Sequence, residues 1–328
     1  MVRCEACGLG ISKKAKACID CGHPNPIFTT LQKRRKEETK RLVHMEQKRL
    51  EETQAKRLAE REKKALAEIK AQGLSEEEAK RLDKAAKALA EEAMRREGGE
   101  NKLRAHGGPA VLAQIHRARE IGATNLRLVG NGIIDVTPLA GLTRLEELDL
   151  WNNRISDVTP LAGLKNLEEL DLWGNRISDV APLAKLTKLT KLVLVGNQIN
   201  DVTPLAGLTK LAKLYLPKNQ INDITPLAGL TDLNKLVLTG NRIADLTPLT
   251  GLSELARLYL PQNQISDLTP LAKLTSLTIL NLSDNKIKDV TPLRKLTKME
   301  ILWLSGNPIS ADQKAMIKKA LPNCDIEF

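Results

Sequence analysis

Four cysteines near the amino terminus are spaced as ligands of a metal ion. Cys4 and Cys7, and then Cys18 and Cys21, form two C-x2-C pairs with ten residues between them, and a glycine follows each pair. Two thiolates at this spacing can hold one side of a tetrahedral ion, and a second pair completes its coordination. A segment of about 25 residues buries too little apolar surface to fold alone, so the metal must supply stability. The spacing therefore predicts a structural Zn²⁺ site with four thiolate ligands.

The main alternative for these cysteines is a pair of disulfides. The opening residues MVRCEACGLG lack the apolar region of a secretion signal, so we expect a cytoplasmic protein with reduced thiols. Residues 3–24 resemble the small zinc ribbons found at the N-termini of many bacterial proteins. His23 could also bind metal, but four thiolates already fill a structural site and leave no position for catalysis. We assign residues 1–27 to this zinc ribbon.

A charged segment that favours helix follows over residues 28–104. Residues 31–72 are rich in Lys, Arg, Glu, Ala and Leu and contain neither Pro nor Gly. After Gly73, Ser75 and Glu78 form a capping box that opens a second helix. We therefore expect a helical hairpin or a coiled coil, and self-association through it is one alternative. An apolar seam at alternating three- and four-residue spacing supports this expectation, formed by Ala79, Leu82, Ala86, Leu89 and Ala93.

The excess positive charge lies in the front third of the chain. Residues 1–122 contain 28 Lys and Arg against 19 Asp and Glu, whereas residues 123–328 contain 23 against 21. Residues 32–72 carry 14 basic and 8 acidic side chains, so residues 1–72 could bind the phosphates of a nucleic acid. Residues 32–72 contain no aromatic side chain for base stacking, which favours the alternative of a solvated spacer.

A 22-residue pattern repeats nine times in the remainder of the chain. Around Asn153 it reads L-x-x-L-x-L-x-x-N-x-I, which is the leucine-rich-repeat signature. Leu148 and Leu150 alternate with outward residues, as a short strand requires. The asparagine can satisfy backbone groups where the chain turns. Thr159 is expected as an N-cap before Pro160, which would begin a short helix or 3₁₀ turn. The asparagine of each copy is Asn131, Asn153, Asn175, Asn197, Asn219, Asn241, Asn263, Asn285 or Asn307.

The repeats resemble a known family over residues 131–310. The stretch D-V-T-P-L-A-G-L within the 22-residue unit is similar to the internalins and to their relatives among phosphatase-regulating repeat proteins. This resemblance implies an α/β solenoid, a horseshoe with a parallel sheet on its concave side. Internalins are secreted and anchored at the cell surface; this sequence shows neither a secretion signal nor an anchoring tail, so we do not extend a host-receptor role to it.

One coil of such a solenoid cannot bury its own leucines, but stacked neighbours can. We therefore expect one repeat domain over residues 105–328, with a helix capping each end of the array. The N-terminal cap helix is predicted at 109–122, the repeats at 123–310 and the C-terminal cap at 311–328. Cys324 is expected to pack in that cap as a small apolar side chain.

Three columns of outward side chains are predicted to line the concave face, six, four and two residues before each repeat asparagine. Five of the seven aromatic residues lie in these columns, and the charges are segregated along them. Adjacent like charges cost roughly a few tenths of a kcal/mol each, so the pattern indicates a partner surface. The alternative is that strands favour aromatics and that duplicated repeats copy their residues. The predicted partner-binding residues are Glu147, Asp149, Trp151, Glu169, Asp171, Trp173, Lys191, Lys213, Tyr215, Lys235, Arg257, Tyr259 and Trp303.

No combination of residues in the sequence indicates an enzyme. All four histidines precede the repeats, and there is no phosphate-binding loop, G-x-G-x-x-G or G-x-S-x-G motif. A row of aspartates from Asp135 to Asp289 has one member per repeat and is explained by turn formation. No apolar run reaches the roughly 18–20 residues that a membrane span requires. We predict a non-enzymatic adaptor that binds a protein on the concave face; the alternative is a nucleic-acid or ribosome-associated factor acting through the zinc ribbon and the basic helix.

Overall fold

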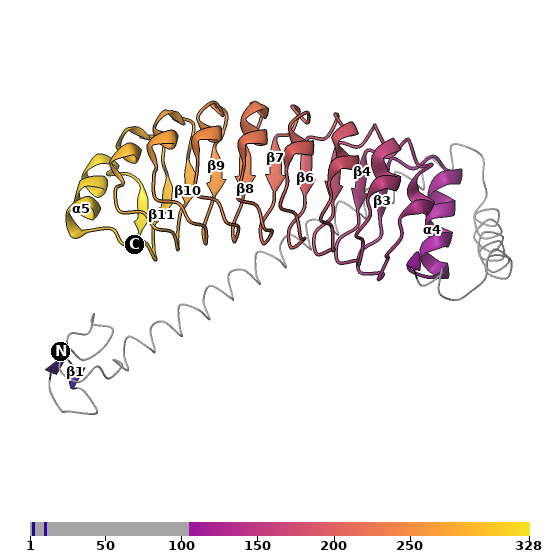
Figure 1. Cartoon of the computed structure of the whole chain (residues 1–328), viewed down its shortest axis with the longest axis horizontal. Coiled ribbons are helices and arrows are strands. Elements are labelled where there is room, and N and C mark those ends of the chain that lie inside the picture. The colour runs from indigo at the N-terminus through magenta and orange to yellow at the C-terminus, as the bar shows by residue number, and fades with distance from the viewer. Residues whose placement is uncertain (1, 4–9, 12–104) are drawn as a thin grey trace. The chain divides into compact units, whose positions relative to one another are not determined.

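The computed structural model of the chain describes residues 2–3, 10–11 and 105–328 (Figure 1). The predicted zinc ligands, the helical segment, and the basic residues assigned to nucleic-acid binding or self-association lie outside the described residues. In the N-terminal part, β1 (Val2–Arg3) pairs antiparallel with β2 (Gly10–Ile11), with Val2 opposite Ile11.

Residues 105–328 form a solenoid around one ten-stranded parallel sheet, whose strands lie side by side in chain order (Figure 1). From β3 to β11, each strand pairs with the same positions of the next repeat, as Leu148 does with Leu170, so the register follows the 22-residue period. The predicted solenoid with a parallel sheet is confirmed. The strands are β3 (Asn125–Arg127), β4 (Glu147–Asp149), β5 (Glu169–Asp171), β6 (Lys191–Val193), β7 (Lys213–Tyr215), β8 (Lys235–Val237), β9 (Arg257–Tyr259), β10 (Ile279–Asn281), β11 (Ile301–Trp303) and β12 (Asp325–Glu327).

A short 3₁₀ helix follows each of the strands β3–β10. The predicted N-cap threonine is wrong: Thr159 is the first residue of its 3₁₀ helix, and the capping residue Val158 makes no side-chain cap bond. Instead, Asp157 Oδ1 accepts a hydrogen bond of 2.8 Å from the Thr159 amide, so the aspartate row forms the turns as expected. The 3₁₀ helices are Thr137–Leu139, Thr159–Gly163, Ala181–Lys185, Thr203–Leu205, Thr225–Gly229, Thr247–Leu249, Thr269–Lys273 and Thr291–Lys295.

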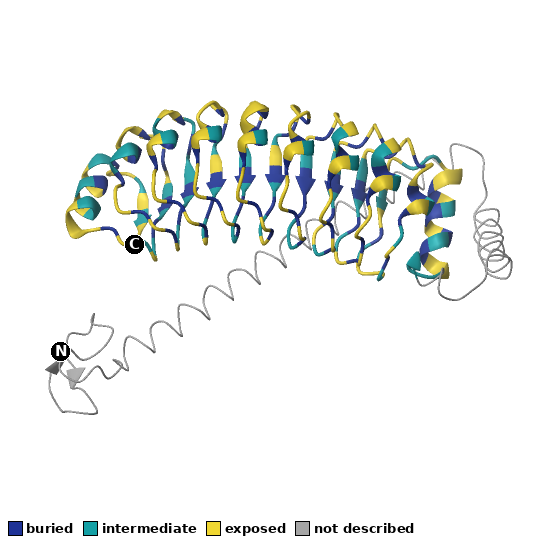
Figure 2. Cartoon of the chain, in the orientation of Figure 1, coloured by how far each residue is buried: buried dark blue, intermediate teal, exposed yellow. Residues whose placement is uncertain are grey.

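The core runs without interruption through all the repeats (Figure 2). The middle residues of β4 to β11 are at most 2% exposed, and the leucines that follow the 3₁₀ helices are buried too; Leu214 and Leu230, for example, are both 0% exposed. Because each repeat adds its leucines to those of its neighbours, the stack buries surface that a single coil would leave in water.

The repeat asparagines form a buried ladder of hydrogen bonds beneath the turns. Asn219 shows the pattern: its Oδ1 accepts from the Ile199 amide at 3.0 Å, and its Nδ2 donates to the carbonyls of Leu194 and Leu216 at 2.9 and 3.1 Å. The expected role of asparagine in satisfying backbone groups is therefore confirmed. The residue before each repeat asparagine adopts a positive φ, for example 66° at Gly174 and 54° at Lys218, which the sequence pattern had not indicated.

A helix covers the apolar core at each end of the array (Figure 1). The N-terminal helix α4 (Pro109–Glu120) buries Val111, Ala113, Ile115 and Ala118, and it ends two residues before the predicted boundary. At the other end, the Ser310 hydroxyl caps α5 (Ala311–Ala320) by accepting a bond from the Gln313 amide at 3.3 Å. The final strand β12 completes the sheet, and Cys324 packs partly buried against the core.

Candidate functional site

The outward side of the sheet carries all thirteen residues predicted to contact a partner. We call it the strand face. It consists of the first and third residues of each strand from β3 to β11 and of the residue two positions after the end of each strand, such as Trp151 after β4. In β4, for example, Leu148 is 2% exposed, whereas Glu147 and Asp149 on either side are only half-buried. The predicted columns therefore point away from the core, and Val193 in these columns is nevertheless buried, at 8% exposure, without belonging to the core cluster.

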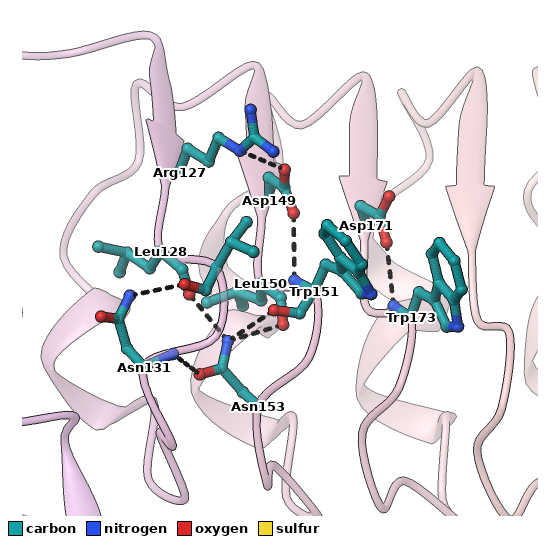
Figure 3. Close-up of polar contacts among 10 residues, drawn as sticks. Arg127, Leu128, Asn131, Asp149, Leu150, Trp151, Asn153, Asp171 and Trp173 are labelled. Carbon is teal, nitrogen blue, oxygen red and sulfur yellow. Dashed lines mark hydrogen bonds and ion pairs between the residues drawn. The ribbon is translucent and has the colours of Figure 1, made fainter. Parts of the chain in front are cut away.

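Two tryptophans stack on one another at the N-terminal part of the strand face (Figure 3). The ring centroids of Trp151 and Trp173 are 5.0 Å apart and the ring planes differ by 20°. An aspartate holds the backbone of each: Asp149 Oδ1 accepts from the Trp151 amide at 3.1 Å, and Asp171 Oδ1 accepts from the Trp173 amide at 2.9 Å. These two bonds were not predicted, although the D-x-W spacing is shared by both repeats. Trp173 remains 40% exposed, so the stack presents an apolar surface to solvent.

Ion pairs link the acidic side chains of this region to cations on neighbouring strands. Arg127 Nε lies 3.1 Å from Asp149 Oδ2 (Figure 3), and Lys191 Nζ lies 2.9 Å from Glu169 Oε2. Burial lowers the pKa of Lys191, but the hydrogen bond and the charge of Glu169 outweigh it and raise that pKa above its ordinary value. Lys191 is thus compensated within the chain, unlike the three cations that follow it.

Asp171 is the carboxyl group of the strand face with the most perturbed proton affinity. Burial raises its pKa to about 6, the hydrogen bond from the Trp173 amide opposes the rise, and the charge of Asp149 adds to it. At neutral pH this carboxylate is mostly ionised beside an exposed aromatic stack. It offers a negative charge to a cationic group that approaches Trp173.

Lys213, Lys235 and Arg257 form what we call the basic row, on the adjacent strands β7, β8 and β9. The sheet register places Lys213 opposite Lys235 and Lys235 opposite Arg257. Within residues 105–328, none of the three forms an ion pair. The Lys235 Nζ lies 5.2 Å from the ring centroid of Tyr215 and 5.5 Å from that of Tyr259. Burial lowers the pKa of Lys235, and the charges of Arg257 and Lys213 lower it further.

The aromatic side chains continue towards the C-terminal end of the face. The ring centroids of Tyr259 and Trp303 are 6.5 Å apart, with the planes inclined by 31°. Tyr259 therefore contacts the basic row on one side and Trp303 on the other. The column of residues two positions before each repeat asparagine has small side chains in this region. Two of them, Ser283 and Ser305, have hydroxyl oxygens 3.3 Å apart.

The described residues hold no group of three or more His, Cys, Asp and Glu side chains arranged to bind a metal ion. In the same part of the chain, no helix has both the length and the apolar character needed to cross a membrane. The arrangement on the strand face offers stacked rings and charges of both signs, which are features of a binding surface.

Known proteins with similar sequences and structures share the repeat array. A family model described as leucine-rich repeats in two copies matches residues 124–163, 165–207, 209–251, 253–295 and 275–314. The structure of internalin C2 from Listeria monocytogenes is 40% identical, with a TM-score of 0.57, over 58% of this chain and 91% of that chain. The structure of the internalin InlF from the same organism is 36% identical, with a TM-score of 0.52, over 60% of this chain and 64% of that chain.

A leucine-rich-repeat protein of Leptospira interrogans, LIC12759, is also similar in structure. It is 28% identical, with a TM-score of 0.55, over 62% of this chain and 60% of that chain. This chain thus spans under two thirds of the InlF and Leptospira structures. A search of the curated proteins found no match.

Proposed function

Because the chain belongs to the leucine-rich-repeat family, with repeats of the internalin type, we propose that it is a non-enzymatic adaptor that binds a protein partner on its strand face. The observation that carries this proposal is the exposed Trp151–Trp173 stack, held by hydrogen bonds from the backbone to Asp149 and Asp171. A site of this kind on a rigid sheet loses little conformational entropy when a partner binds.

The composition of the face supports binding over a purely structural role. Five of the seven aromatic residues in the chain lie on it, and Trp and Tyr dominate the energetics of protein interfaces. Trp173 remains 40% exposed, so the fold leaves apolar surface of this side chain in water that a partner could cover. The carboxylates around the stack favour a partner that presents basic or amide groups there.

A binding measurement with the full chain tests this proposal. Trp151→Ala combined with Trp173→Ala is expected to weaken capture of a protein from a nuclease-treated lysate, with at least about 30-fold lower affinity for the identified partner, because truncated hot-spot residues cost ~2 kcal/mol or more. The matched control is Ile121→Ala combined with Ile134→Ala, two exposed apolar residues away from the strands. Equal affinity of the tryptophan variant and the intact chain would exclude the strand face as the binding surface.

We also propose that Cys4, Cys7, Cys18 and Cys21 hold one structural zinc ion. The pairing of β1 with β2 supports this, because the first cysteine pair lies in the segment that joins two paired strands. A four-thiolate site would stabilise the N-terminal segment and would leave no open position for chemistry.

Zinc content measured by mass spectrometry checks this second proposal. The intact chain is expected to carry one zinc ion per molecule, and Cys7→Ser with Cys21→Ser is expected to reduce the zinc to background. Cys324→Ser is the control, since burial and the nearby Asp325 raise the pKa of that thiol to about 11 and keep it protonated. Zinc-free protein with oxidised N-terminal thiols would show that the disulfide alternative is correct.

A further inference from the structure

We propose that the basic row (Lys213, Lys235 and Arg257) is the docking site of an acidic protein segment that crosses strands β7, β8 and β9. This inference rests on the proposed function, because it names the chemistry of a partner on the same strand face. It adds a second subsite to the one formed by the tryptophan stack.

The first support is that the charges of the basic row are uncompensated. On the same face, Arg127 and Lys191 each pair with a carboxylate on the adjacent strand, at 3.1 and 2.9 Å. The basic row instead places three cations on consecutive strands in register, about 4.8 Å from strand to strand. Like charges directly opposite in a sheet are destabilising. Carboxylates supplied by a partner would remove this repulsion, so binding would relieve a cost that the free chain carries.

The second support is that Lys235 is held in position before any partner arrives. Its ammonium group lies between the rings of Tyr215 and Tyr259, at 5.2 and 5.5 Å from their centroids. The half-buried Lys235 side chain therefore has less freedom to lose than an ordinary surface lysine. Burial and the neighbouring cations lower the pKa of Lys235, and a carboxylate placed beside it would act in the opposite direction.

The third support concerns the kind of anion, and it favours a protein segment over a nucleic acid. The basic row spans only three strands, or about 10 Å between its outer members. Beyond Lys191 the face becomes acidic, and a long uniform polyanion would meet Glu169 and Asp171 there. The tyrosine rings contact the Lys235 ammonium group, so they are less available for base stacking. A segment of about four or five residues with two or three carboxylates covers the row, and basic or amide groups beyond it would meet the tryptophan stack.

The experiment selects peptides from a random displayed library on the full chain. Three forms are compared: the intact chain, the triple variant Lys213→Ala, Lys235→Ala, Arg257→Ala, and a matched control Lys185→Ala, Lys273→Ala, Lys295→Ala. The control removes three exposed charges at the ends of 3₁₀ helices, away from the strands. Peptides retained by the intact chain and by the control are expected to be enriched in Asp and Glu. The triple variant is expected to lose that enrichment and to bind the best acidic peptide at least about tenfold more weakly.

Lys191→Ala provides a second comparison within the strand face. Because Lys191 is paired with Glu169, its loss is expected to change the affinity for the acidic peptide much less than the loss of the basic row. Retained peptides without acidic enrichment, or equal affinity of the intact chain and the triple variant, would overturn the inference. So would displacement of the peptide from the row by a 20-nucleotide single strand that binds more tightly.

The result separates the inference from the proposed function. If the tryptophan variant loses its partner while the triple variant behaves as the intact chain does, the strand face still binds protein and only the acidic occupant is excluded. If neither set of variants changes binding, both proposals fail. Removal of mutually repelling charges offsets the loss of the Lys235 contacts with the tyrosine rings, and thermal unfolding of the triple variant checks that it is folded.

Discussion

Asn219→Ala is expected to lower the free energy of unfolding by about 2–4 kcal/mol, because it leaves the buried Ile199 amide without a partner and removes three bonds to backbone carbonyls. The asparagine side chain accepts from the Ile199 amide and donates to the carbonyls of Leu194, Leu216 and Pro217, and each of these carbonyls also accepts a second bond. Two of these groups belong to the preceding repeat, so the side chain links one coil to the next. Asn219 is 8% exposed, and water cannot replace the lost bonds without opening the turn.

Urea unfolding of the intact chain and of two variants measures this effect. Asn200→Ala is the matched control, since Asn200 is exposed and lies one residue after Ile199. The control is expected to shift the midpoint little, whereas Asn219→Ala lowers it strongly. If unfolding becomes less cooperative, a lower slope would show that the array has separated at the substituted repeat. A loss below about 1 kcal/mol would mean that the ladder contributes little to stability.

Asp171→Asn is expected to raise stability at pH 7.5 by about 1–3 kcal/mol. The pKa of Asp171 is raised from 3.8 to about 6 in the folded chain, so between these values the folded state binds more protons than the unfolded state. The free energy of unfolding therefore rises as pH falls through 6, and the ionised group lowers it above pH 6. The asparagine Oδ1 can still accept the bond from the Trp173 amide, and the variant carries no charge to desolvate.

Unfolding at pH 7.5 and at pH 5.0 provides the measurement. The intact chain is expected to gain stability at pH 5.0 relative to Asp171→Asn, whereas Asp232→Asn, at an exposed position, should follow the intact chain. Parallel pH dependence of the intact chain and Asp171→Asn would contradict the raised pKa. At pH 5.0 and above, the aspartates of the turns stay ionised and do not affect the comparison. Hydrogen bonds from Thr203 and Thr225 lower the pKa of Asp201 and Asp223, so the stability that these two carboxylates contribute is lost only at lower pH.

The cost of keeping Asp171 ionised bears on function. A carboxylate that lowers stability at neutral pH persists beside the exposed tryptophan stack, where a cationic group of a partner would offset its burial. Asp171 and the basic row thus share one property: each carries an electrostatic cost in the free chain that a partner of opposite charge would relieve.

Most of the repeat fold could be predicted because its cause is local and periodic. The spacing of Leu148, Leu150 and Asn153 within one repeat specifies a strand and a turn, and the constant 22-residue period specifies a parallel register. The same period identified the outward columns, since side chains alternate along any strand. The wrong prediction that Thr159 caps the 3₁₀ helix has a local cause as well. The carboxylate of Asp157, a stronger acceptor than a hydroxyl, lies two residues before Thr159 and accepts the bond from the Thr159 amide.

Contacts between repeats depended on side-chain conformations and distances that no periodic pattern contains. Lys191 and Lys213 occupy the same position of successive repeats, yet only Lys191 has a carboxylate within reach. The reason is that the same position of the preceding strand holds Glu169 in the case of Lys191 and Lys191 itself in the case of Lys213. The stacking of Trp151 on Trp173, the position of Lys235 between two tyrosine rings and the burial of Asp171 likewise arise from neighbours on other repeats. Repeat spacing thus specified the scaffold from the sequence, whereas the electrostatic character of the strand face emerged only when the coils were stacked, since charge interactions depend on distance and burial.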